Sequence, residues 1–153
     1  MLDDLDKRIL DTLQHDGRVK RNELAELVGL SLPATSDRLR KLEERGYITG
    51  YTAILDPAKF GKDITAFVQV TVDTSLHYDN FLKHVQQSAE ILECHAITGD
   101  GSHLLKIRTD NTAALERVLS RIQSWKEVRR TRTSVVLSTT KETLNFDIHP
   151  STP

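Results

Sequence analysis

Apolar residues recur at helical spacing in three short segments near the start of the chain. These segments are residues 4–15, 21–28 and 32–45, and Gly29 and Ser31 lie between the last two. A glycine directly after the last periodic residue ends a helix, and a serine before the next one caps it. The pattern therefore predicts three helices, of which the second and third are joined by a tight turn.

The period of the apolar positions changes in the second half of the chain. Residues 64–72 alternate between apolar and polar side chains, as a half-buried strand does. Helical spacing returns over residues 78–88 and after Asn111, and strand patterns occupy residues 91–98, 102–109 and 128–137. The order is β-α-β-β-α-β, the split βαβ pattern. We therefore predict an α+β protein with an N-terminal helix-turn-helix (winged-helix-like) domain and a C-terminal ferredoxin-like βαββαβ domain.

Turn-forming residues mark the division between the two halves. An Asp-Pro pair and a Gly-Lys-Asp run lie between the two patterns, and a β-rich segment, residues 47–55, precedes them and predicts a strand. The predicted division is a helix-turn-helix domain at residues 1–56, a linker at 57–63, a ferredoxin-like domain at 64–140 and a C-terminal tail at 141–153. The tail has no clear period, and we interpret it as a strand or as an arm that packs on a partner subunit.

The overall charge gives no sign of a nucleic-acid partner, because 21 basic and 22 acidic residues leave a formal net charge of -1. Affinity for DNA must then come from local clusters, since individual lysine and arginine side chains make the phosphate contacts. Such a cluster lies between Arg18 and Arg45. The single cysteine, Cys94, cannot form an internal disulfide, and no apolar run approaches the roughly 20 residues that span a bilayer. We expect a cytoplasmic protein that does not bind membranes.

The basic third helix and the turn before it have the arrangement that fits a helix into the major groove of double-stranded DNA. A basic helix alone is more often a solvated surface, but the upstream helix, the glycine turn and the serine cap together favour docking on DNA. Residues at the start of the third helix are expected to approach base edges, and its cations to reach phosphates or flanking guanines. The predicted DNA-binding residues are Arg21, Ser31, Leu32, Pro33, Ala34, Ser36, Asp37, Arg38, Arg40 and Lys41.

Four stretches of the chain carry a resemblance to a known family. They are LDDLDKRILDTLQHDGR, ELAELVGLS, RLRKLEERGYITGYTAILDP and ILECHAITGDGSHLLKI. The third stretch is the most specific, because a generic helix-turn-helix does not share it. With these motifs the chain resembles the Lrp/AsnC, or feast/famine, family of transcription regulators. The resemblance implies a C-terminal domain that forms dimers and binds small effectors, typically amino acids, and dimers that stack into tetramers or octamers.

One turn departs from the family pattern. Where the family frequently has Gly-Asp-Tyr-Asp-Tyr, this chain has Gly-Asp-Gly-Ser-His, which indicates a changed effector preference. By itself an Asp-Gly turn is a common hairpin connection. The resemblance adds a binding role, in which Asp100 accepts from an ammonium group and backbone N–H groups around Gly99 and Gly101 receive a carboxylate. The predicted effector-binding residues are Thr98, Gly99, Asp100, Gly101, Ser102, His103, Thr133 and Ser134.

Metal, cofactor and catalytic sites have no clear pattern in the sequence. Cys94 and His95 are adjacent on a predicted strand, so they point to opposite faces and poorly share one ion. No HxxxH or CxxC spacing occurs, and no convergent acid, base or nucleophile is apparent. We predict no metal, no cofactor and no enzymatic activity. The cationic run Arg129, Arg130 and Arg132 is interpreted as an exposed face or as a source of intersubunit ion pairs, and a second DNA contact is the less favoured alternative.

The sequence therefore predicts a sequence-specific, effector-responsive transcription regulator. An isolated four-stranded sheet has edges and an open face that need covering, and Phe67, with Thr65 and Thr71 beside it, offers a surface for a partner sheet. We expect at least a dimer. Two alternatives stay open, an architectural DNA-binding protein without a ligand and a small-molecule enzyme of ferredoxin-like fold.

Overall fold

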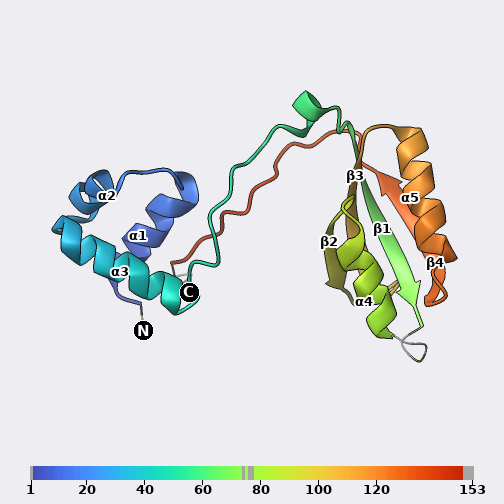
Figure 1. Cartoon of the computed structure of the whole chain (residues 1–153), viewed down its shortest axis with the longest axis horizontal. Helices are drawn as coiled ribbons and strands as arrows, with labels where there is room; N and C mark the ends of the chain where they lie inside the picture. Colours follow the sequence, from blue (N-terminus) through green and yellow to red (C-terminus); the bar gives the residue numbers. More distant parts are fainter. Residues whose placement is uncertain (1, 74, 76–77, 150–153) are drawn as a thin grey trace. The chain divides into compact units, whose positions relative to one another are not determined.

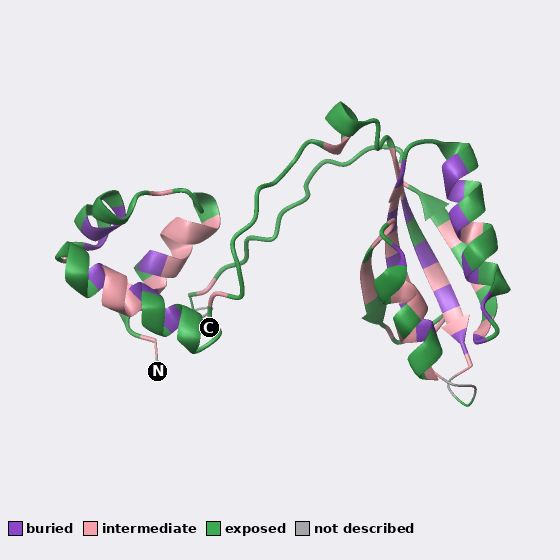
Figure 2. Cartoon of the chain, viewed as in Figure 1, coloured by how far each residue is buried: buried purple, intermediate pink, exposed green. Residues whose placement is uncertain are grey.

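The computed structural model describes residues 2–73, 75 and 78–149. The chain folds into two compact units, one made of Met1–Ile54 with Lys141–Pro153 and the other of Leu55–Thr140. Over these described residues, the first unit contains three α-helices and the second contains the sheet (Figure 1). Each unit has its own buried core, seen as the buried bands of Figure 2.

The helices of the first unit begin and end at the predicted residues to within one position. They are α1 (Asp4–His15), α2 (Arg21–Val28) and α3 (Leu32–Glu44). Ile9 of α1 forms one buried cluster with Leu24 and Val28 of α2 and with Leu39 and Leu42 of α3. Helices this short are marginal in isolation, so these apolar contacts stabilise them.

Local caps determine where the helices of the first unit begin and turn. Asp3 caps α1 through a capping box with Asp6, and Ser31 caps α3 by accepting a backbone N–H. Gly29 ends α2 in the left-handed region, at φ +74°, where a side chain would be strained. α2 begins after Lys20 without a side-chain cap. The turn between α2 and α3 therefore depends on Gly29 and Ser31.

The strand predicted over residues 47–55 is not formed. In the structure residues 47–55 form neither a strand nor a helix, and nearly all of them are exposed. A short 3-10 helix follows, η1 (Pro57–Phe60), which Asp56 caps and Gly61 ends. A β-rich pattern becomes a strand only where a neighbouring strand takes its backbone hydrogen bonds. None of the described residues supplies such a neighbour to residues 47–55.

In its described residues, the second unit contains a four-stranded antiparallel sheet and two α-helices. Its elements are β1 (Ile64–Val72), α4 (Tyr78–Gln87), β2 (Ile91–Ala96), β3 (His103–Thr109), α5 (Thr112–Ser124) and β4 (Val128–Val135). The strand order is β2-β3-β1-β4 (Figure 1). The predicted βαββαβ fold is confirmed, although β2, β3 and β4 are each one or two residues shorter than predicted.

The alternating pattern of β1 separates the two faces of the sheet. Ala66, Val68 and Val70 are fully buried and lie in one cluster with Phe81 of α4 and Ile122 of α5. Both helices therefore cover the same face. The other side of the sheet, which we call the open face, carries the intervening residues of β1, among them Phe67, Gln69 and Thr71.

The pairing of β1 with β4 decides which residues of β4 share the open face. Directly paired residues point to the same side of an antiparallel sheet. Gln69 pairs with Arg132 and Thr71 pairs with Arg130, so both arginines lie on the open face. Thr131, between them, faces the helices and accepts a hydrogen bond from a side chain of α5 at 2.9 Å.

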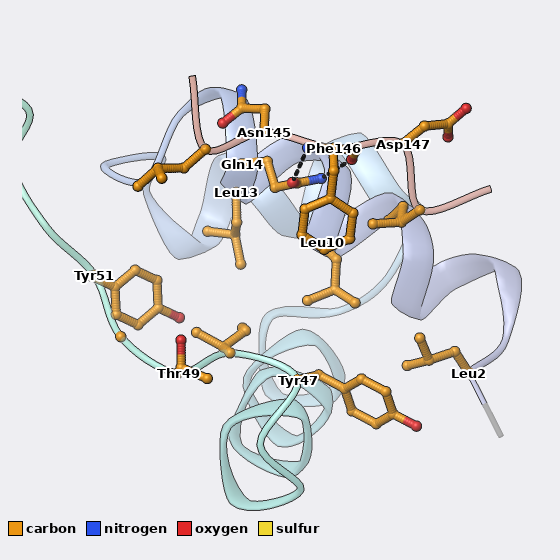
Figure 3. Close-up of a pocket in the computed structure, with 14 residues that line it drawn as sticks. Leu2, Leu10, Leu13, Gln14, Tyr47, Thr49, Tyr51, Asn145, Phe146 and Asp147 are labelled. Carbon is orange, nitrogen blue, oxygen red and sulfur yellow. Dashed lines mark hydrogen bonds between the residues drawn. The ribbon is translucent and has the colours of Figure 1, made fainter. Parts of the chain in front are cut away.

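The C-terminal tail belongs to the first unit, where it forms an arm on α1. The side-chain amide of Gln14 clamps this arm, because Nε2 donates to the Phe146 carbonyl at 3.1 Å and Oε1 accepts from the Phe146 N–H at 3.0 Å (Figure 3). The arm, α1 and residues 47–51 line a cavity of about 610 Å³. Its walls are largely apolar and include Leu10, Leu13, Tyr51 and Phe146 (Figure 3). Within this chain the described part of the tail therefore lies on α1 without forming a strand, and the Gln14 side chain holds it there.

Gln14→Ala removes both hydrogen bonds of this clamp, each worth about 1 kcal/mol net. The buried core of the first unit contains no arm residue, so we expect little change in melting temperature. Chymotrypsin should cut the full chain after Leu144 or Phe146 several-fold faster than in the wild type. Gln86→Ala, at an exposed glutamine of α4, is the matched control. Equal cleavage rates for the two variants would contradict the clamp.

Candidate functional site

The exposed start of α3 forms the first candidate site. Thr35, Leu39 and Leu42 are buried and hold one side of α3 inside the first unit. The opposite side presents residues predicted to contact DNA, which are exposed Ser31, Leu32, Pro33 and Ala34 and half-buried Ser36 and Asp37. The Ser31 cap and the proline in the first turn favour the helical start of α3. The helix therefore presents its first turn from a supported position, as a recognition helix does.

Arg38, which was predicted to contact DNA, is bonded inside the first unit. Its Nη1 donates to Asp3 Oδ2 and to Asp6 Oδ1, both at 2.7 Å. Hydrogen bonding to Asp6, and then to Asp3, raises the pKa of Arg38 further above its ordinary value. The Asp6 side chain is only 12% exposed, so its charge needs this partner. Arg38 joins α3 to the start of α1, and we remove it from the candidate DNA contacts.

Arg40 and Lys41 share an acidic neighbour on the surface of α3. Arg40 contacts Asp37 at 2.7 Å and Glu44 at 2.6 Å, and Lys41 contacts Asp37 at 2.6 Å. Hydrogen bonds from Lys41 and then from Arg40 lower the pKa of the Asp37 carboxyl. Exposed ion pairs of this kind contribute little to stability, so both cations can exchange a carboxylate for a phosphate. Arg21 is also exposed, at the start of α2.

Arg38→Met keeps the aliphatic stem but removes the guanidinium that Asp3 and Asp6 share. We expect the melting temperature to fall by roughly 5 °C in a domain of this size, because a nearly buried carboxylate loses its partner. Arg40→Met changes only exposed pairs and should leave the melting temperature within about 1 °C. Thermal unfolding followed by circular dichroism compares the two variants. Equal melting temperatures would show that Arg38 has no internal role.

The turn between β2 and β3 forms the second candidate site. Gly99 and Gly101 have φ angles of 98° and 104°, and Asp100 between them is exposed. A Cβ on Gly101 would lie 3.3 Å from the carbonyl oxygen of Val70. This position therefore needs glycine both for its backbone angle and for the space it leaves. The close approach holds the turn against β1.

Two residues that were predicted to bind the effector, Ser102 and His103, form hydrogen bonds inside the second unit instead. Ser102 Oγ accepts from the Val72 N–H at 2.8 Å and donates to the Val70 carbonyl at 3.2 Å. His103 is only 4% exposed, and its Nε2 lies 2.7 Å from the Tyr78 hydroxyl. Both side chains support the packing of the sheet, and we remove them from the candidate site.

Three other predicted effector ligands lie outside the cavity beside the turn. Thr133 pairs with Val68 and therefore faces the helices, whereas Ser134 pairs with Phe67 on the open face. Thr98 is exposed next to the turn. Of the predicted residues, the structure brings only Gly99, Asp100 and Gly101 to this cavity.

The cavity beside the turn has a volume of about 250 Å³ and is bounded by the turn and the open face. It is lined by Gly99, Asp100, Gly101, Gln69, Thr71, Arg130 and Arg132. The two arginines were not predicted as effector ligands. The signal that could have found them is their alternate spacing on a strand, which places both on one face. The lining therefore combines one carboxylate with two guanidinium groups.

Burial lowers the pKa of His103 below its ordinary value of 6.5. The unfolded chain then binds a proton that the folded His103 excludes, so this contribution to stability is complete above about pH 6.5 and is lost as pH falls. We expect the melting temperature of the wild type to fall between about pH 7 and pH 5 more steeply than that of His103→Gln. His149→Gln, at an exposed position, is the control. Identical slopes in all three proteins would contradict the buried neutral state.

Comparison with known protein families decides the assignment. Residues 65–146 match the family model described as the Lrp/AsnC ligand binding domain, and residues 2–49 match a winged helix-turn-helix DNA-binding model. The chain belongs to the Lrp/AsnC family. It is therefore a DNA-binding transcription regulator, as its sequence predicted.

Relatives match this Lrp/AsnC chain over nearly its whole length. The HTH-type transcriptional regulator FL11 of Pyrococcus horikoshii is 37% identical over 147 residues, which cover 96% of this chain and 97% of the relative. The transcriptional regulator NMB0573 of Neisseria meningitidis, in complex with L-methionine, has a TM-score of 0.92 at 32% identity and coverages of 96% and 97%. The feast or famine regulatory protein Rv3291c of M. tuberculosis, complexed with L-methionine, has a TM-score of 0.89 at 34% identity and coverages of 95% and 99%.

Other kinds of site have little support in the described part of this Lrp/AsnC chain. No group of three or more histidine, cysteine, aspartate or glutamate side chains is placed there to hold a metal ion. No helix that the structure describes is long and apolar enough to cross a membrane. Cys94 packs against the core of the second unit, and burial raises the pKa of its thiol. The candidate sites are therefore the start of α3 and the cavity beside the turn.

Proposed function

We propose that this Lrp/AsnC protein binds specific sites on double-stranded DNA as a homodimer and that an amino-acid effector modulates this binding. The observation that carries the proposal is the exposed first turn of α3, supported from behind by Thr35, Leu39 and Leu42. A helix held in this way can enter a major groove while its other side stays packed.

The proposed contacts with base edges lie in the first turn of α3. Leu32, Pro33 and Ala34 offer apolar groups, which suit the methyl group of thymine. Ser36 offers a hydroxyl, and Ser31 presents the capped helix N-terminus to the DNA backbone. Few direct hydrogen bonds to bases are expected, so sequence-dependent DNA shape contributes to specificity.

The proposed phosphate contacts come from Arg21, Arg40 and Lys41. All three are exposed, and the first of them lies at the start of α2. Phosphate contacts position a protein on the duplex without reading its sequence. Asp37 is proposed to neutralise Arg40 and Lys41 when DNA is absent, rather than to contact a base.

Arg40→Gln should weaken binding to the preferred duplex and to random duplex by a similar factor, because it removes a phosphate contact. The slope of log affinity against log salt should fall by about one. The preferred duplex is first selected from a random library, and fluorescence anisotropy then measures both affinities over a salt series. Lys83→Gln, at an exposed lysine of α4, is the control. Equal affinity of the wild type for both duplexes at every salt concentration would favour an architectural protein instead.

A homodimer would present two copies of α3 to successive major grooves, about 34 Å apart. The open face of the sheet supports contact with a partner, because Phe67 is 37% exposed there beside polar residues. Stacking of dimers into tetramers or octamers is part of the same proposal. It would allow one protein particle to contact several turns of DNA.

The effector class is supported by two similar regulators, those of N. meningitidis and M. tuberculosis, which are complexed with L-methionine. In this chain we place the effector at the turn, where Asp100 would accept from the ammonium group and backbone N–H groups of Gly99 and Gly101 would bind a carboxylate. Such a ligand alters DNA binding only if its affinity differs between two states or assemblies.

The relatives are transcription regulators, which supports a regulator rather than an enzyme. We assign no catalytic residue and no cofactor, and we place the activity in the cytoplasm.

A further inference from the structure

The cavity beside the turn has an excess of positive charge. Asp100 supplies one carboxylate, whereas Arg130 and Arg132 supply two guanidinium groups. Within the described residues, neither arginine is joined to another group by a hydrogen bond or ion pair, whereas the neighbouring Arg129 is bonded to Asp73. Two like charges held near each other favour an anion between them.

The register of the sheet fixes how these charges are spaced. Arg130 and Arg132 are two positions apart on β4, which separates their Cα atoms by roughly 7 Å along the strand. Their partners on β1, Thr71 and Gln69, add a hydroxyl and a carboxamide to the same wall. Asp100 approaches from the turn, which is a different element. The site therefore offers two separate anion-binding groups and one cation-binding group.

From this arrangement we infer that the effector is an amino acid with two carboxylates, such as glutamate or aspartate. The inference rests on the proposed effector function and names its ligand class. Asp100 binds the ammonium group, and Arg130 and Arg132 each bind one carboxylate. The backbone N–H groups of Gly99 and Gly101 add hydrogen bonds to one of these carboxylates. Guanidinium binds carboxylate with two parallel hydrogen bonds, which gives strength and a defined orientation.

Charge balance distinguishes this ligand class from neutral amino acids. The cavity has a net charge of +1 from two arginines and one aspartate, and an acidic amino acid has a net charge of -1 at neutral pH. A neutral amino acid has one carboxylate, so it would leave one guanidinium without an anion. An apolar side chain would also meet walls made of Gln69, Thr71 and charged groups. Desolvating these groups without hydrogen bonds is unfavourable.

The size of the cavity agrees with a ligand of this kind. Its volume of about 250 Å³ lies below the roughly 300–1,000 Å³ of pockets that hold drug-sized molecules. A single amino acid is therefore a better match than a nucleotide or a peptide.

Calorimetry on the full chain tests the inference with L-glutamate, L-aspartate, L-glutamine, L-methionine and glutarate. We expect L-glutamate or L-aspartate to bind at least tenfold more tightly than L-glutamine, which lacks the second carboxylate. Glutarate, which lacks the ammonium group, should also bind at least tenfold more weakly than L-glutamate. Arg130→Gln and Arg132→Gln should each reduce affinity for the acidic amino acid tenfold or more. Arg129→Gln is the matched control, since it changes a cation of the same strand that does not line the cavity.

The possible failures separate the ligand class from the effector function itself. Tighter binding of L-methionine or L-glutamine, unchanged by Arg130→Gln and Arg132→Gln, would overturn the ligand class and leave an amino-acid effector in place. No binding of any of the twenty amino acids in a thermal-shift screen would overturn both proposals. Analytical ultracentrifugation of the same variants measures whether they still form the dimer. Loss of the dimer with unchanged affinity for L-glutamate would show that the arginines serve a subunit interface, which also overturns the ligand class.

Discussion

The alternation of buried and exposed residues along β1 is the constraint on which the second unit depends. β1 lies between β3 and β4, so its register sets the position of both neighbours. If β1 shifted by one residue against its neighbours, all its buried side chains, including Val68, would move from the core to the open face. With that face buried under α4 and α5, Gln69 and Thr71 must lie on the open face. Pairing then brings Arg132 and Arg130 beside them, so hydrophobic burial determines where the polar cavity forms.

In the first unit, the ion pairs of the cations on α3 support the proposal of which of them contact DNA. Arg38 is bonded to Asp3 and Asp6, so this arginine links the recognition helix to the start of α1. Arg40 and Lys41, two and three positions further along, pair only with side chains on the surface of α3 itself. A helix that is already anchored loses less conformational freedom when it binds. Arg38 therefore holds α3 in place, whereas we propose that Arg40 and Lys41 stay available for phosphates.

Periodicity predicted the helices and strands because it reflects which side of an element is buried. The prediction failed at residues 47–55, since a β-rich pattern says nothing of whether a partner strand is present. The internal role of Arg38 could not be predicted, because its two acidic partners lie far away in the sequence. The burial of His103 could have been predicted from the sequence, because His103, Leu105 and Ile107 occupy every second position of β3 and therefore share one face. Spacing places a side chain on a face, but the partner it meets there depends on tertiary packing.

The two proposed binding surfaces both attract anions, and they differ in what they exclude. The exposed side of α3 is an open surface, and its cations Arg40 and Lys41 would meet the regularly spaced phosphates of a duplex. In the proposed effector site, Asp100 would repel a polyanion and admit an anion only if it also carries a cationic group. Such an unfavourable contact discriminates between ligands as much as the attractive ones do. The formal net charge of the chain is -1, so the protein as a whole does not attract anions. Anions bind only at places where local cations outnumber acidic residues.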